Sequence, residues 1–128
     1  MPTPATPSTP EELFEHSPEG LAICVAFSRL VADVTGDDVA VRTTKTQVAF
    51  RRRRGFAYVW PPWVGLRDHV DAPAVVSFAL GQELASPRVK QVVHPSSRVW
   101  MHHVEVRDPG ELDDEIAGWV REAYDAAG

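Results

Sequence analysis

The chain has 128 residues and a mass of 14.1 kDa, which suits one domain with one hydrophobic core. Its composition, 44% hydrophobic and 24% charged, argues against a wholly disordered chain. No apolar run reaches the ~20 residues of a membrane helix; we expect no secretory signal, and the only cysteine, Cys24, excludes an internal disulfide and a cysteine-based zinc site. A cytoplasmic protein is the expectation.

Residues 1–10 are rich in Pro and Thr and lack apolar periodicity, which predicts a flexible tail before a single α+β domain over residues 11–127. Two helices follow the tail. Thr9 and Ser17 each precede a proline, the order typical of an N-cap and a first helical residue. The second helix is stopped by Gly36. Its apolar stripe consists of Ile23, Phe27, Leu30, Val31 and Val34.

The middle of the chain predicts β-strands, because β-branched and aromatic residues are frequent there and turn residues separate them. The predicted strands are 39–42, 45–52, 56–60, 63–67, 75–80 and 99–106, of which 75–80 is the most apolar and therefore central. Residues 53–55 predict a hairpin turn in which Gly55 takes a positive φ. In the last strand Trp100 and His102 share one face, whereas His103 lies on the other.

Asp108, Pro109 and Glu111 have the spacing of a capping box and predict the start of a final helix. Its buried stripe is Leu112, Ile116, Trp119, Val120, Ala123 and Tyr124. The fold class is therefore α+β, with N-terminal helices, an antiparallel sheet of about five or six strands, and a C-terminal helix packed on one face.

The net charge of −5 is unevenly distributed along the chain. Residues 39–104 carry ten basic and three acidic side chains, a net +7, while the flanking segments carry −12. A positive field of this kind concentrates anionic ligands. The alternative is that acidic helices pack over a basic sheet and each part is solvated separately.

The arginine run at residues 51–54 is the most prominent candidate site. Together with Lys45 it offers planar guanidinium donors that suit phosphate groups, and Trp60 lies close by in sequence for stacking on a planar ligand. The alternative is a solvated turn whose arginines protect an edge strand from aggregation. The low pI of about 5.5 counts against duplex DNA as the ligand.

The histidines form a second candidate cluster. His102 and His103 point to opposite faces, so they do not chelate one metal together, and no third ligand beside His94 is evident. A proton-transfer pair, either His103 with Glu105 or His102 with Lys45, is an alternative. Cys24 is interpreted as a small core residue.

Several of these residues together resemble a known family. They are Lys45-Thr46 with Phe50, the arginine run with Phe56-Ala57, His102-His103-Val104, Leu112-Asp113 with Glu115, and Glu122-Ala123-Tyr124. The pattern is similar to a bacterial domain-of-unknown-function family (number 5655) and, more remotely, to MmcQ/YjbR-like proteins, whose fold has been linked to DNA binding. The resemblance implies a small α+β domain without an assigned activity. Trp100 stands where the family pattern often has a further histidine, so a shared metal site is not implied.

The sequence thus predicts a binding module for an anionic or planar ligand on a basic sheet face. Its ligand-binding residues are Lys45, Arg51, Arg53, Arg54, Trp60, Trp100, His102 and His103. The expected partner is an anionic small molecule, a nucleic acid or an acidic segment, with no membrane, no metal and no cofactor, and the chain is a monomer or a homodimer. The alternatives are a small enzyme, or a homodimerising interaction protein that uses Trp60, Trp63 and the sheet edge.

Overall fold

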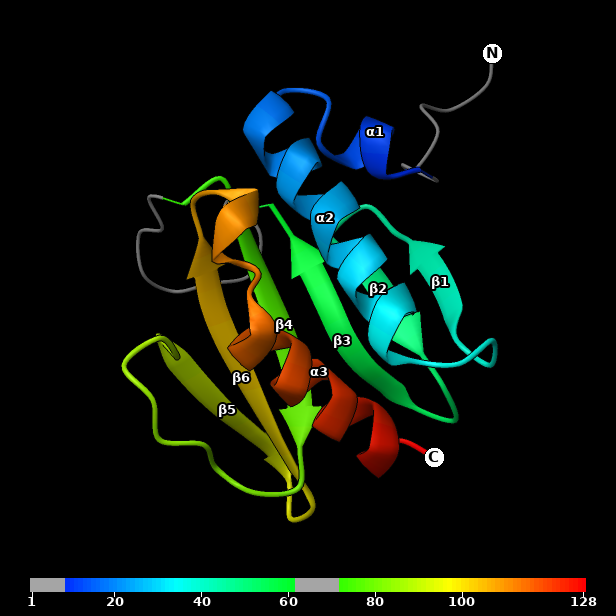
Figure 1. The fold of residues 1–128 in the computed structure, drawn as a ribbon, viewed down its shortest axis with the longest axis vertical. Helices are drawn as coiled ribbons and strands as arrows, with labels where there is room; N and C mark the ends of the chain where they lie inside the picture. The colour runs from blue at the N-terminus through cyan, green and yellow to red at the C-terminus, as the bar shows by residue number, and fades with distance from the viewer. Residues whose placement is uncertain (1–8, 62–71) are drawn as a thin grey trace.

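The computed structural model describes residues 9–61 and 72–128 (Figure 1). Two N-terminal helices, α1 (Pro10–Leu13) and α2 (Pro18–Val34), precede the strands, and the short 3-10 helix η1 (Pro109–Glu111) and α3 (Asp114–Ala126) follow them. The strands are β1 (Ala40–Thr43), β2 (Val48–Arg51), β3 (Gly55–Trp60), β4 (Ala74–Leu80), β5 (Gln91–Ser96) and β6 (Val99–Val106). Most of the predicted tail, residues 1–8, and the predicted strand 63–67 lie outside the described residues.

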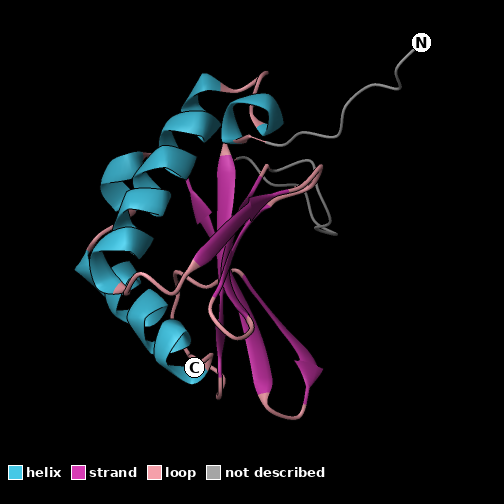
Figure 2. Cartoon of the chain, turned by 90° about the vertical axis from the view of Figure 1, so that its right-hand side faces the viewer, coloured by secondary structure: helices cyan, strands magenta, loops and turns pink. Residues whose placement is uncertain are grey.

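The six strands form one antiparallel sheet in the order β1-β2-β3-β4-β6-β5, which confirms the α+β class. The apolar strand β4 lies in its interior, as predicted. All helices of the described segments lie on one side of the sheet (Figure 2). We call that side the helix-covered face and the other side the open face.

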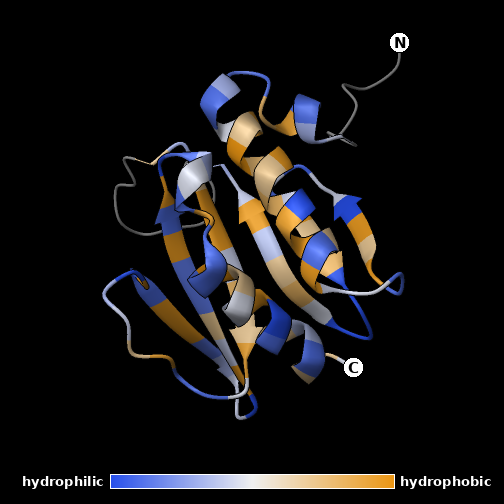
Figure 3. Cartoon of the chain, in the orientation of Figure 1, coloured by the Kyte–Doolittle hydropathy of each residue, from blue (hydrophilic) through white to orange (hydrophobic). Residues whose placement is uncertain are grey.

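The core fills the space between the helix-covered face and the two long helices. Figure 3 shows apolar residues along much of α2 and an alternation of apolar and polar residues along β6. Phe27 of α2 meets Phe50 of β2 edge to face, with ring centroids 5.6 Å apart. Fully burying an aromatic or aliphatic side chain of this size contributes about 1.5–3 kcal/mol to folding. The predicted stripe positions are buried at Ile23, Phe27, Val31, Ile116, Val120, Ala123 and Tyr124.

The helix starts follow the sequence signals, with one correction. Thr9 and Ser17 cap α1 and α2 by accepting hydrogen bonds from the backbone N–H groups of residues 12 and 20. The Asp108 capping box, however, closes only η1. The chain then turns, and Asp113 caps α3 by accepting from the Ile116 N–H at 3.2 Å. A capping box is satisfied by a single turn, so it does not fix how far the helix continues.

One strand was missed and one further prediction was wrong. Strand β5 was not predicted, because Pro95 removes a ladder donor and most of its residues are exposed, as befits an edge strand. Gly55 does not take a positive φ. A Cβ at this position would instead meet the Tyr58 hydroxyl group, so any other residue here requires the Tyr58 side chain to move.

Candidate functional site

The structure places the eight predicted site residues in four separate regions. Arg53 and Arg54 lie in the β2–β3 turn at the end of α3, whereas Trp100 and His102 lie on the helix-covered face. The open face carries the remaining strand residues Arg51, Trp60 and His103, while Lys45 lies in the β1–β2 turn at the far end of β2.

The arginine turn is bound to the C-terminal end of α3. The Arg54 guanidinium donates to the Ala126 carbonyl at 2.7 Å, and the Arg53 backbone N–H donates to the Ala127 carbonyl at 3.2 Å. Guanidinium groups at a helix C-terminus satisfy free carbonyls and complement the negative end of the helix dipole. Part of the run therefore fastens β2 and β3 to α3.

Arg52, which was not among the predicted site residues, completes this attachment. Its Nε donates to Asp38 at 2.8 Å, and its guanidinium lies 4.1 Å from the centroid of the Tyr124 ring. The Tyr124 hydroxyl donates to the other oxygen of Asp38 at 2.6 Å. Both hydrogen bonds lower the pKa of Asp38, and the one from Tyr124 has the larger effect. Arg88 is neutralised similarly, by Asp113 and Glu115, so acidic flanks offset some of the central cations.

His102 belongs to the core. It is fully buried and stacked on Phe78 with ring centroids 5.5 Å apart. The Leu84 N–H donates to its Nε2 at 2.8 Å, so the proton of the neutral ring is on Nδ1, which is buried without a hydrogen-bond partner. Burial lowers the pKa of His102. The backbone near Phe78 and Trp100 raises this pKa in part, although neither residue forms a well-aligned hydrogen bond to the ring.

Trp100 is also partly covered on the helix-covered face. Its ring stacks on His94 of β5 with centroids 3.6 Å apart and planes 10° from parallel. One face of the predicted stacking surface is therefore occupied by a side chain of the same protein.

On the open face, Trp60, Ser77 and His103 form a hydrogen-bonded chain. The Trp60 indole N–H donates to the Ser77 hydroxyl at 2.7 Å, and this hydroxyl lies 2.6 Å from His103 Nδ1. Ser77 is fully buried, so its O–H is satisfied when it donates to an unprotonated Nδ1 and the His103 proton is on Nε2. Burial first, and then the neighbouring His102, lower the pKa of His103.

Neither predicted proton-transfer pair is in contact. Glu105 forms an ion pair with Arg107 at 3.5 Å and no hydrogen bond to His103. Lys45 and His102 lie apart, one in the exposed β1–β2 turn and the other beneath the helices. Cys24 is buried, which raises the pKa of its thiol to about 12 and agrees with its interpretation as a core residue.

The open face over β1, β2 and β3 is basic and aromatic. The register aligns Arg42 with Ala49 and Ala49 with Tyr58. Arg51 lies on the same face, two residues beyond Ala49 on β2. Burial raises the pKa of Tyr58, while the positive charge of Arg51 acts in the opposite direction. No residue from 39 to 61 is acidic. Arg42 was missed as a candidate, although its alternation with Ala40 and Val41 in the predicted strand places it on this face.

Residues 29–127 match the family described as Domain of unknown function (DUF5655). The chain belongs to this family. The match begins within α2 of this DUF5655 domain and includes all six strands and α3, so it contains every predicted site residue. Neither a curated protein nor a solved structure matches the chain.

Two classes of site find no support in the described parts of the DUF5655 domain. Within residues 9–61 and 72–128, no three His, Cys, Asp or Glu side chains lie together as metal ligands would. In the same residues, no helix has the length and apolar character needed to cross a bilayer.

Proposed function

We propose that this DUF5655 domain binds an anionic ligand with planar groups, of the class of a short single-stranded nucleic acid or a nucleotide, on its open face. The binding surface, which we call the basic patch, consists of Arg42, Arg51, Tyr58 and Trp60. One observation carries the proposal: the exposed Arg42 of β1 and Arg51 of β2 share one face of the sheet with Tyr58 of β3, and these three strands carry no carboxylate.

The lack of ion-pair partners for the two arginines among the described residues supports the proposal. Neither Arg42 nor Arg51 forms an ion pair or a side-chain hydrogen bond with another described residue. Their guanidinium groups are therefore available to phosphate oxygens, which arginine binds through two parallel N–H donors. An exposed guanidinium group is stable in water without an ion-pair partner. All of its N–H donors therefore remain available to a bound anion.

The surroundings of Tyr58 favour a flat ligand. Ala40 and Ala49 are the small residues between the arginines, and they leave the surface of β1 and β2 low. A base stacked on an aromatic side chain contributes about 1–3 kcal/mol. The overall charge of −5 opposes long polyanions at a distance, which favours a short single strand over a duplex. The remote similarity to MmcQ/YjbR-like proteins remains a prediction that points in the same direction.

The test is fluorescence anisotropy of a labelled ten-nucleotide oligo(dT), with a duplex of the same length for comparison. We expect the single strand to bind more tightly. Two phosphate contacts predict that affinity falls about sevenfold between 50 and 200 mM salt. The double variant Arg42→Ala/Arg51→Ala loses at least tenfold in affinity.

The matched control is Arg29→Ala/Arg121→Ala, which removes two exposed arginines from α2 and α3 and changes the net charge equally. It leaves the affinity within about twofold. Absence of binding by the unmodified protein, or an equal loss in the control variant, contradicts the proposal. A cytoplasmic location and a monomeric or homodimeric state stay as the accompanying predictions.

A further inference from the structure

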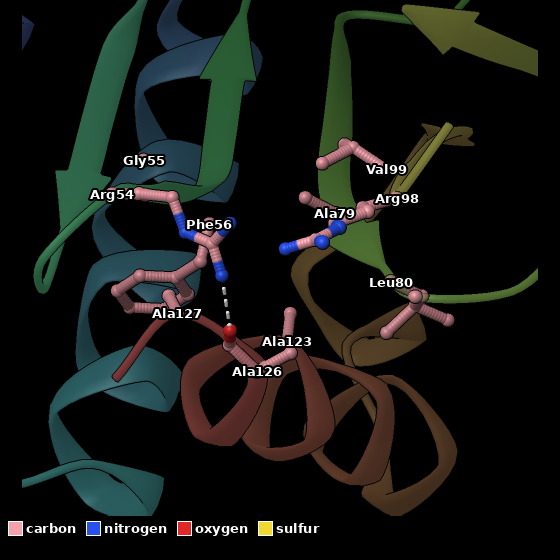
Figure 4. A pocket seen from close by; sticks show the side chains of 11 residues that line it. Arg54, Gly55, Phe56, Ala79, Leu80, Arg98, Val99, Ala123, Ala126 and Ala127 are labelled. Atoms are coloured by element: carbon pink, nitrogen blue, oxygen red, sulfur yellow. Dashed lines mark hydrogen bonds between the residues drawn. The ribbon is translucent and has the colours of Figure 1, made fainter. Parts of the chain in front are cut away.

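We propose a second binding site, separate from the basic patch, for a small organic oxyanion: a carboxylate or phosphate attached to a compact apolar group. The site is a pocket of about 230 Å³ at the C-terminal end of α3. Two arginines line it, Arg54 from the β2–β3 turn and Arg98 from the β5–β6 turn (Figure 4). Arg98 was not predicted as a site residue.

Sheet topology creates this pocket. The start of β3, the end of β4 and the start of β6 lie side by side, since Ala57 pairs with Phe78 and Leu80 pairs with Trp100. The turns before β3 and before β6 therefore reach the same end of the sheet, where α3 ends above them. Figure 4 shows the Arg54 and Arg98 side chains extending toward one another from opposite sides of the pocket.

The charge arrangement calls for an anion. No acidic residue lines the pocket, and Arg98 has no ion pair or hydrogen bond with a described residue. Arg54 is held in place by its hydrogen bond to Ala126, and its remaining N–H donors are free for a ligand. Two guanidinium groups facing one space repel each other. An oxyanion between them replaces this repulsion with charge-assisted hydrogen bonds.

The rest of the wall favours an apolar group of limited size. Val99, Ala79 and Ala126 supply its accessible apolar surface, while Phe56 and Leu80 are buried behind it. The volume of about 230 Å³ is below the roughly 300–1,000 Å³ of pockets for drug-sized ligands. A single substituted ring or a short branched chain matches this volume.

The competing explanation is that Arg54 only caps α3 and Arg98 is only a solvated turn residue. The two explanations differ for Arg98→Met, because this exposed side chain contributes nothing to the helix cap. The matched control is Arg53→Met, which removes the same charge from the turn next to Arg54 but does not line this pocket.

The experiment measures binding of phenyl phosphate by isothermal titration calorimetry, with inorganic phosphate and phenol as comparison ligands. We expect the dissociation constant for phenyl phosphate to rise at least tenfold in Arg98→Met and to stay within about twofold in Arg53→Met. Inorganic phosphate and phenol bind at least tenfold more weakly than phenyl phosphate, since inorganic phosphate lacks the apolar ring and phenol lacks the phosphate group.

Three results overturn the proposal. The first is an equal loss of affinity in Arg98→Met and Arg53→Met, which indicates general electrostatic attraction to the positive charges rather than binding in the pocket. The second is equal binding of phenyl phosphate and inorganic phosphate, which removes the apolar half. The third is loss of oligo(dT) binding in Arg98→Met, which makes the pocket part of the basic patch. Retained oligo(dT) binding in that variant supports two separate sites. If the unmodified protein does not bind oligo(dT), the proposed function fails, and the phenyl phosphate titration still tests the pocket by itself.

Discussion

On the helix-covered face of the sheet, His102 is fully buried against Phe78, whereas its sequence neighbour His103 lies on the open face and is bonded to Ser77. The arginine run divides in the same manner. Arg52 and Arg54 are bound to Asp38 and to the end of α3, while Arg51 has no such partner. Neighbouring residues of one type therefore have different roles. Strand alternation sends the two histidines to opposite faces, and the turn after β2 carries Arg52 and Arg54 to α3 while Arg51 stays on the strand.

The largest effect we expect from this contrast is in His102→Ala. Removing a fully buried, stacked ring leaves a cavity and deprives the Leu84 N–H of its acceptor, at a cost of about 2–5 kcal/mol in the free energy of unfolding. Urea denaturation measures it. The control His94→Ala removes an exposed ring from β5 and costs much less. Similar losses in both variants would contradict the assignment of His102 to the core.

A smaller loss is expected from Ser77→Ala on the open face. The variant removes the shared partner of Trp60 and His103 and leaves two polar groups unsatisfied, a cost of about 1–3 kcal/mol. Urea unfolding followed by tryptophan fluorescence reports it. Ser28→Ala serves as the control, because that hydroxyl only bonds a carbonyl of its own helix. If the two serine variants lose the same stability, the hydrogen-bonded chain contributes nothing.

Both histidines also predict a pH dependence of stability. Burial lowers the pKa of His102 and His103, so the folded protein holds them neutral, while the unfolded chain takes up protons below about pH 6.5. Stability is therefore fully present above that pH and falls as the pH decreases through it. The urea midpoint should be lower at pH 5.5 than at pH 7.5, with a weaker dependence in His102→Phe. An unchanged midpoint would show that neither ring is held neutral.

The smallest effects separate two adjacent arginines. Arg52→Met breaks the contacts with Asp38 and Tyr124 and lowers the urea midpoint. Arg51→Met changes the free energy of unfolding by no more than about 0.5 kcal/mol, as is usual for an exposed residue without partners. Equal midpoints for the two variants would mean that the attachment of the turn to α3 does not stabilise the fold.

Local signals account for the parts of the fold that could be predicted. The caps Thr9 and Ser17, the apolar stripes and the alternation in β6 each depend on residues within one or two turns of each other. Strand β5 escaped prediction because Pro95 and its exposed residues carry a weak pattern, and its place in the sheet depends on pairing with β6.

The site depended on contacts that no local pattern contains. Alternation placed His102 and His103 on opposite faces, but which face the helices cover is decided by packing across the whole sheet. The strand order β3-β4-β6-β5 brings Arg54 and Arg98 to one pocket although they are far apart in sequence. Likewise, Asp38 lies beside Arg52 because β1 pairs with β2, and α3 then brings Tyr124 to the same carboxylate.

The most direct measurement of the central proposal is an NMR titration of the ¹⁵N-labelled protein with unlabelled oligo(dT). We expect chemical-shift changes at the backbone amides of Arg42, Ala49, Arg51 and Tyr58, and none along the exposed sides of α2 and α3. Shifts confined to the helices, or no shifts at millimolar oligonucleotide, would contradict binding at the basic patch.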